Sequence, residues 1–422
     1  MTIADLILSL NDQIRDHAGR SLLVSFFIAP VAYLFVNEII RHNARIDNLK
    51  GPSGFPLVGN IWDIRTNAAE KYREWAKKFG PVYQIQLGNI PVIVVNSAAA
   101  ARELFGKNGQ ALSSRPEFYT FHKVVSDTAG TTIGTSPYSD SLKRRRKGAA
   151  SALNRPSVAT YVPHLNIETL DFIKELYTDG KVGEVPIDPM PMIQRLSLSL
   201  ALTLNWGIRL KSREDDLFGE ITHVEEEISR FRSTTGNLQD YIPLLRLNPV
   251  NFHSAKAREM RRRRDAYLSS LNRGLDERIA KGTYKPCIQA NVILDKEAKL
   301  NEDELTSISL TMLSGGLDTI TTLLAWFIAY LSQHPEIQDK AVSEIRKLYA
   351  EDQPMCDVED DQKCQYIVAL VHAEVWEDPE VFRPERWIEQ PDAPLFTYGI
   401  GYRIEGKRRP NQFGGNAETL QI

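Results

Sequence analysis

The chain has 422 residues, of which 42% are hydrophobic, so it is long enough to bury a sizeable core. Its formal net charge of -3 shows no excess of positive charge, and no nucleic-acid partner is expected. The three cysteines, Cys287, Cys356 and Cys364, are too few for a disulfide framework, which favours a reducing compartment for the body of the chain.

An apolar run without a charge lies near the N-terminus, at residues 21–36, after a mostly polar segment at 1–20. A spanning helix needs about 20 apolar residues, with roughly 17 at the lower end of the range. A cleaved signal peptide and a buried core helix are the alternatives. The polar segment before the run, and the lack of an A-x-A site after it, favour an uncleaved, single-pass membrane anchor. The flanking lysines and arginines slightly favour a cytosolic body.

Residues 37–60 form a linker that ends in GPSGFPLVGN (51–60). Its prolines and glycines cannot continue a helix, so the segment is interpreted as a stiff joint, although an ordinary surface loop fits equally well. Residues 66–80 then show helical spacing up to Gly80-Pro81. The run VYQIQLGNIPVIVV (82–95) predicts a β-hairpin.

Most of the remaining chain has helical periodicity. The clearest predicted helices cover residues 159–178, 191–205, 214–233 and 254–281. We therefore expect a mainly α fold with a small β part, and a single body over residues 61–404.

The most informative predicted helix runs from Asn301 to Pro335. Asn301 and Glu304 form a capping-box pattern, and from Leu305 to Leu331 Asp318 is the only charged residue. A second transmembrane helix is disfavoured because an aspartate at mid-bilayer costs about 2.5–3.5 kcal/mol. We expect instead a helix covered on all sides in the core of a globular protein, with Asp318 in apolar surroundings.

Two adjacent glycines, Gly315 and Gly316, cost about 1 kcal/mol each inside a helix. They suit a place where a bulky, flat group approaches the backbone. Asp318 and Thr319 follow, and a carboxylate beside a hydroxyl can relay protons. A small-residue packing site with a satisfied aspartate explains the same pattern equally well.

These residues carry a family resemblance. The run Gly315 to Thr319 resembles the oxygen-activating motif (A/G)-G-x-(D/E)-T of the haem-thiolate monooxygenases, the cytochrome P450 family. FRPERW (382–387) resembles the family's meander motif, and FTYGIGYR (396–403) resembles the start of its haem-binding loop. The anchor, the joint and the hairpin occur in the expected order. The resemblance covers nearly the whole chain up to Ile404 and is greatest to the fungal phenylacetate hydroxylases.

The resemblance implies an enzyme with haem as cofactor, which takes electrons from an NADPH-dependent reductase and hydroxylates a small aromatic acid. It implies a location in the endoplasmic reticulum membrane. Asp318 and Thr319 would deliver protons during oxygen activation. The haem contacts implied by the family motifs are Arg146, Gly315, Gly316, Phe396, Gly399 and Arg403, with Arg146 and Arg403 as partners of the propionates. For the other arginines of KRRRK (143–147) and RRRR (261–264), a solvated helix face is the expectation.

The chain departs from the family pattern at several places. Leu142 stands where the family usually has tryptophan, and Ile320 replaces a usual threonine or serine. Glu374 begins an E-x-x-R motif whose arginine is missing, so Glu374 and Arg386 remain from a three-membered ion network. We expect an internal deletion of several dozen residues near 375/376.

The largest departure is Glu405, which occupies the place of the cysteine that ligates the haem iron in the family. A carboxylate is a hard donor and does not supply the electron donation of a thiolate. No metal ligand is therefore assigned in this chain, and residues 405–422 are interpreted as an aberrant tail. The sequence predicts a membrane-anchored monooxygenase that is impaired in this form; a non-catalytic, membrane-anchored binding or regulatory protein is the alternative.

Overall fold

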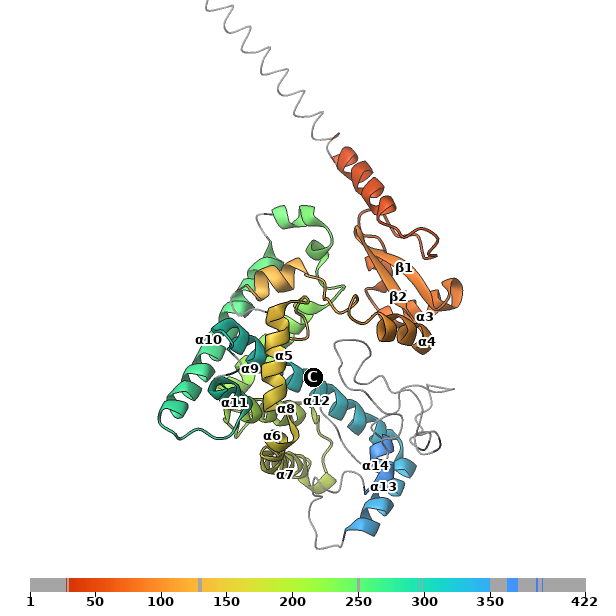
Figure 1. Cartoon of the computed structure of the whole chain (residues 1–422). Helices are drawn as coiled ribbons and strands as arrows, with labels where there is room; N and C mark the ends of the chain where they lie inside the picture. The colour runs from red at the N-terminus through yellow and green to blue at the C-terminus, as the bar shows by residue number, and fades with distance from the viewer. Residues whose placement is uncertain are drawn as a thin grey trace, which may run out of the picture. The chain divides into compact units, whose positions relative to one another are not determined.

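The structure is a computed structural model that describes residues 28, 30–127, 131–248, 251–295, 297, 299–349, 363–370, 385 and 389 (Figure 1). The chain divides into two compact units. The first contains Met1–Ala101 and Ser233–Asn251, and the second contains Arg102–Arg232 and Phe252–Ile422. Each unit is described by itself. Over the described residues the chain is mainly helical with a small β part, as the sequence predicts.

The first unit contains a two-stranded antiparallel sheet and short helices. Residues 30–43 are helical, so the described part of the predicted anchor continues as a helix beyond residue 36. The strands pair as a hairpin with Val82 opposite Val95 and Leu87 opposite Ile90, which confirms the predicted turn. The elements are α2 (Ile61–Ile64), α3 (Ala68–Phe79), β1 (Val82–Leu87), β2 (Ile90–Val95), α4 (Ala98–Ala101), η4 (Leu238–Asp240) and η5 (Pro243–Leu247).

The glycine- and proline-rich segment 51–60 packs on β1. The backbone N–H of Asn60 donates to the carbonyl of Gln86 over 2.6 Å, and that of Gly88 donates to the carbonyl of Val58 over 3.0 Å. Gly59 has a φ of +62°, and a Cβ there would lie 2.2 Å from the Gln86 carbonyl oxygen. Only glycine fits this close approach, so the segment is an integral part of the first unit.

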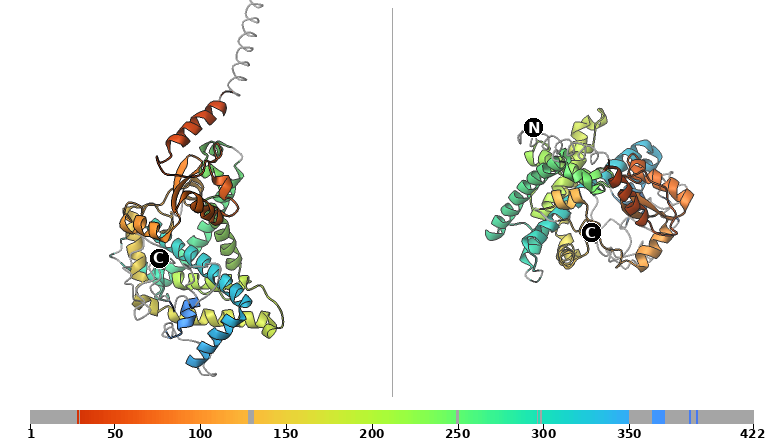
Figure 2. Two further views of the ribbon diagram at one scale, coloured as in Figure 1. Left: turned by 90° about the vertical axis from the view of Figure 1, so that its right-hand side faces the viewer. Right: turned by 90° about the horizontal axis from the view of Figure 1, so that it is seen from above.

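The second unit consists of helices, seen from two further sides in Figure 2. The predicted helices at 159–178, 191–205, 214–233 and 254–281 correspond within a few residues to α7, α8, α9 and α10. The elements are η1 (Arg102–Gly106), η2 (Tyr119–Val125), α5 (Asp140–Ala152), α6 (Arg155–Ala159), α7 (Val162–Asp179), η3 (Lys181–Gly183), α8 (Met190–Trp206), α9 (Asp216–Arg232), α10 (Phe252–Ala280), α11 (Ile288–Leu294), α12 (Glu302–Gln333), α13 (Pro335–Leu348) and α14 (Gln365–Leu370).

Helix α12 packs along α8. Asn205 of α8 donates from Nδ2 to the carbonyl of Ser309 over 2.9 Å, and a hydrogen bond of 3.0 Å joins the hydroxyls of Thr321 and Ser197. These polar contacts sit in a core that includes Trp206 and Leu198 and contains residues from α8, α9, α10 and α12. The capping box of Asn301 and Glu304 is present at the start of α12, as predicted.

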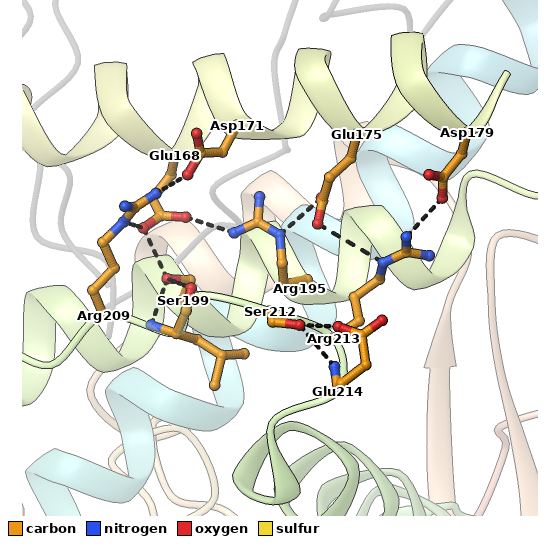
Figure 3. A network of polar contacts seen from close by, with 11 residues as sticks. Glu168, Asp171, Glu175, Asp179, Arg195, Ser199, Arg209, Ser212, Arg213 and Glu214 are labelled. Carbon is orange, nitrogen blue, oxygen red and sulfur yellow. Dashed lines mark hydrogen bonds and ion pairs between the residues drawn. The ribbon is translucent and has the colours of Figure 1, made fainter. Parts of the chain in front are cut away.

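A row of carboxylates on α7 holds α8 and the segment that leads to α9 (Figure 3). Glu168 is buried and accepts hydrogen bonds from Arg195 Nη1 over 2.8 Å, from the Ser199 hydroxyl over 2.8 Å and from Arg209. Further ion pairs join Arg195 to Glu175, Arg209 to Asp171 and Arg213 to Asp179. Because Arg209 and Arg213 lie between α8 and α9, the network fixes the point from which α9 starts.

Candidate active site on helix α12

The two halves of α12 have different surroundings. The buried residues of the helix run from Glu304 to Leu317. Beyond Leu317 large apolar side chains are exposed, including Leu323 (49%) and Trp326 (61%). The expectation that this helix is covered on all sides is therefore wrong for its second half, where α8 and α13 cover some faces and the other described residues leave the rest exposed.

The two glycines of the motif play different structural roles. Among the described residues, a Cβ added to Gly315 would meet nothing within 4 Å, whereas one added to Gly316 would lie 3.4 Å from the Cβ of Ala201 on α8. Gly316 therefore serves the packing of α12 on α8. Gly315 presents bare backbone to open space, as the approach of a flat group requires.

Asp318 does not lie in apolar surroundings, contrary to the sequence expectation. Its side chain is 47% exposed, and its Oδ2 accepts a hydrogen bond from Arg232 Nη2 over 3.1 Å. Thr319, the next residue, is also exposed. The sequence pattern did not reveal Arg232 as the partner, because this residue ends a different helix, α9. The carboxylate is thus a half-exposed member of an ion pair.

A hollow of about 310 Å³ adjoins Asp318. Its wall is formed by α8, α9 and α12 and mostly by residues of polar type, which also contribute apolar surface. The lining residues are Gln194, Thr222, Glu226, Ser229, Arg230, Leu317, Asp318, Thr321 and Thr322. The buried hydroxyl of Thr222 has no hydrogen-bond partner among the described residues, so the hollow can hold water beside the carboxylate of Asp318.

Helix α5 carries Arg146, which is half-buried. Leu142, at the position usual for tryptophan, is 1% exposed and belongs to the core. The expected solvated face is wrong for Arg145, which is buried and donates from Nη1 to the carbonyl of Thr131 over 2.8 Å. Arg144 pairs with Glu304 at the start of α12. This basic run therefore joins α5 to α12 as well as facing solvent.

The second basic run, 261–264 on α10, also differs from the expected solvated face. Arg262 follows the expectation, since its side chain is 73% exposed. Arg264 is fully buried and donates from Nη2 to the carbonyl of Val125 over 2.8 Å. Arg261 and Arg263 pair with Asp127 and Glu220. Four successive positions of a helix face different directions, and here one of the four arginines faces the core.

Several predicted site residues lie outside the described residues: Glu374, Arg386, Phe396, Gly399, Arg403 and Glu405, together with Cys356. Cys287 and Cys364 are free and buried, and burial raises the pKa of both thiols. Within the described part of the chain, no group of three or more His, Cys, Asp or Glu side chains could hold a metal ion.

Residues 49–372 match the family described as cytochrome P450, and the chain belongs to this family of haem-binding monooxygenases. It is 61% identical over 448 aligned positions to 3-hydroxyphenylacetate 6-hydroxylase of Emericella nidulans, covering 96% of this chain and 87% of the relative. It is 45% identical over 352 positions to phenylacetate 2-hydroxylase of the same organism, covering 82% and 67%. The predicted resemblance to the fungal phenylacetate hydroxylases is confirmed.

The matches leave parts of this chain and of its relatives unmatched. The family match ends at residue 372. The 448-position alignment includes only 96% of the 422 residues here, so several dozen positions of the relative have no counterpart in this chain. A cytochrome P450 monooxygenase of Mycosarcoma maydis is 41% identical over 346 positions, and this chain covers 64% of that relative's length.

The described residues fit the family's cofactor on one side. No described residue lies within 4 Å of a Cβ built on Gly315, and Thr319 is exposed, so neither position obstructs a flat group against α12. Glu405, which the sequence resemblance places at the position of the axial ligand, lies outside the described residues and beyond the matched range 49–372.

Proposed function

We propose that the intact form of this protein is a membrane-anchored monooxygenase of phenylacetate-type aromatic acids. Its electron donor is a reductase that uses NADPH. Its relatives are named as hydroxylases of phenylacetate and of 3-hydroxyphenylacetate. The observation that carries the proposal is the motif on α12, where no described residue lies within 4 Å of a Cβ built on Gly315, and Asp318 and Thr319 follow within about one turn of the helix.

In this proposal haem supplies the oxygen activation, and the residues of α12 manage protons. Asp318 is held by Arg232 and adjoins the polar hollow, so it can exchange protons with water there. Thr319 carries the next hydroxyl along the helix. A chain of carboxylate and hydroxyl at one helix turn is suited to pass a proton from solvent towards the face on which Gly315 lies.

We further propose that the 422-residue chain is itself impaired. Glu405 replaces the thiolate, and the expected junction near 375/376 removes the arginine of the E-x-x-R motif. Breaking such a buried ion network costs about 3–5 kcal/mol. The end of the family match at residue 372 supports a junction in this region. Sequencing the transcript across Val375 and beyond Ile404 tests whether codons for the missing segment and the cysteine exist.

The enzymatic proposal is tested with microsomes that contain the protein, a fungal reductase, NADPH and either phenylacetate or 3-hydroxyphenylacetate. An intact form, with the missing segment and Glu405→Cys, should give a ring-hydroxylated product, and the 422-residue chain should give far less. No ring-hydroxylated product from the intact form would exclude the proposed substrate class.

The anchor is proposed to be residues 21–36, in the endoplasmic reticulum membrane with the body in the cytosol. In the described part of the chain, α12 is long and apolar enough to cross a membrane. The anchor proposal does not use α12, because its first half is buried in the second unit. Carbonate washing of microsomes should leave the protein in the pellet, and release of the full chain into the supernatant would exclude the anchor.

A further inference from the structure

A group of charged side chains lies where α9, α10, α12 and η2 meet. Glu225 is 2% exposed and accepts a hydrogen bond of 2.5 Å from the Tyr267 hydroxyl. Arg264 is fully buried. Arg232 pairs with Asp318, and its guanidinium carbon lies 5.9 Å from the centroid of the Phe121 ring. We call Arg232, Arg264, Glu225 and Asp318 the α9–α12 charge cluster.

The cluster has more donors than acceptors. The Nε of Arg232 and both Nε and Nη1 of Arg264 are buried and have no hydrogen-bond partner among the described residues. Each buried donor without an acceptor costs about 1–3 kcal/mol, and more when the group is charged. Such groups usually indicate a site for a water molecule, an ion or a ligand.

The unpaired N–H groups of the cluster favour a ligand that carries hydrogen-bond acceptors. Burial raises the pKa of Glu225, against the opposing effects of the Tyr267 hydrogen bond and of Arg264 and Arg232. This favours the uncharged form of the Glu225 carboxyl. Asp318 balances the charge of Arg232, and the carboxylate of Asp265 lies 3.5 Å from Nη2 of Arg264. The buried Nε of Arg232 still lacks an acceptor among the described residues, and a further carboxylate could accept its hydrogen bond.

We propose that Arg232 binds the carboxylate of the aromatic acid, with Arg264 as the buried positive charge behind it. This inference rests on the proposed function, which requires a substrate that carries a carboxylate. Arg232 is the reachable member of the pair, because its side chain is 25% exposed whereas Arg264 is fully buried. Its ion pair with Asp318 places the bound acid beside Asp318 and Thr319. Arg232 would thus select acids over neutral aromatic compounds.

The test measures binding to the full 422-residue chain, without turnover. Ligand-observed NMR gives the affinities of 3-hydroxyphenylacetate and of its neutral amide. The parent chain should bind the acid more tightly than the amide. Arg232→Gln should lower the affinity for the acid about tenfold or more and leave the affinity for the amide unchanged. The reason is that a charge-assisted hydrogen bond is stronger than one between neutral groups. Arg232→Lys should fall between, because it keeps the charge and loses the planar fork.

Arg262→Gln is the matched control. Arg262 lies on α10, is 73% exposed, pairs with Glu259 and does not line the hollow beside Asp318, so its loss should not change the affinity for the acid. Asp318 is 47% exposed, and the unpaired carboxylate left by Arg232→Gln stays hydrated. Circular dichroism checks the fold of each variant.

Three outcomes would overturn the inference. The parent chain could bind acid and amide with equal affinity, it could bind neither ligand, or Arg232→Gln could lower the affinity for both ligands equally. Product assays on the intact form decide the proposed function separately. Hydroxylation of the acid together with an unchanged affinity in Arg232→Gln would reject the role of Arg232 and leave the function standing. Selective acid binding without any hydroxylated product would reject the function alone.

Discussion

Arg232, the last residue of α9, donates a hydrogen bond of 3.1 Å to the carboxylate of Asp318 in the middle of α12. The two residues are distant in sequence and belong to different helices. Their pairing ties the motif that identifies the family to the helix that forms one wall of the adjoining polar hollow. It also means that the charge of Asp318 is balanced from outside α12.

The first prediction concerns proton delivery by Thr319. In an intact form with the missing segment and Glu405→Cys, Thr319→Ala should lower product formed per oxygen consumed. A positioned proton donor typically contributes about 10²–10⁴-fold to a rate. Oxygen uptake and product are measured together.

Ser332→Ala serves as the control, since Ser332 offers an exposed hydroxyl on the same half of α12 and does not line the hollow. Thr319 is exposed, so its loss should change the free energy of unfolding by no more than about 0.5 kcal/mol. Unchanged coupling in Thr319→Ala would show that the hydroxyl carries no proton.

The second prediction concerns the iron ligand. Haem bound by the 422-residue chain should be ligated by water, histidine or a carboxylate, because position 405 is glutamate. The reduced carbonyl complex should therefore lack the strongly red-shifted Soret band of thiolate ligation. The intact form with Glu405→Cys should show that band. Its appearance in the 422-residue chain would mean that one of the three cysteines reaches the iron.

The third prediction concerns the buried carboxylate on α7. Glu168→Gln should destabilise the protein by about 3–5 kcal/mol, because Arg195 is 1% exposed and loses one of its two carboxylate partners. Denaturant unfolding measures the change. Asp179→Asn is the control: its side chain is 35% exposed, and such a pair is worth about 0–1 kcal/mol. Equal losses of unfolding free energy in the two variants would show that burial of the ion pair does not determine its contribution to stability.

The fourth prediction concerns acid sensitivity at the start of α12. Burial acts to raise the pKa of Glu304, but hydrogen bonds from Arg144, Ser141 and the backbone of Asn301 outweigh it and lower the pKa below its ordinary value. A lowered pKa in the folded state stabilises the protein above the pKa of the unfolded state. This contribution is lost as the pH falls through the lowered value.

Glu304→Gln should therefore weaken the dependence of the unfolding free energy on pH below about pH 5. The measurement is urea unfolding at a series of acidic pH values for both proteins. Glu302→Gln removes an exposed carboxylate from the same helical turn and controls for net charge. Parallel pH curves for the parent chain and Glu304→Gln would show that this carboxyl does not contribute.

Local patterns in the sequence were sufficient for most of the secondary structure. The apolar periodicity of α7, α8, α9 and α10 set their limits within a few residues, and the capping box of α12 formed as expected. The hairpin formed where Gly88 and Asn89 separate two β-rich runs. These signals depend on residues that are close in sequence, so they can be recognised without the tertiary structure. The family motif likewise needed only the order of five residues.

The sequence alone established the class of protein, the motif at Gly315 to Thr319 and the glutamate at position 405. Only the tertiary structure decided which charged residues are buried. Arg264 and Arg262 belong to one basic run, yet one is fully buried and the other is exposed, because the rotation of α10 against its neighbours selects the inward position. The pairing of Asp318 with Arg232 has the same origin, since the packing of helices sets contacts between residues that no local pattern connects.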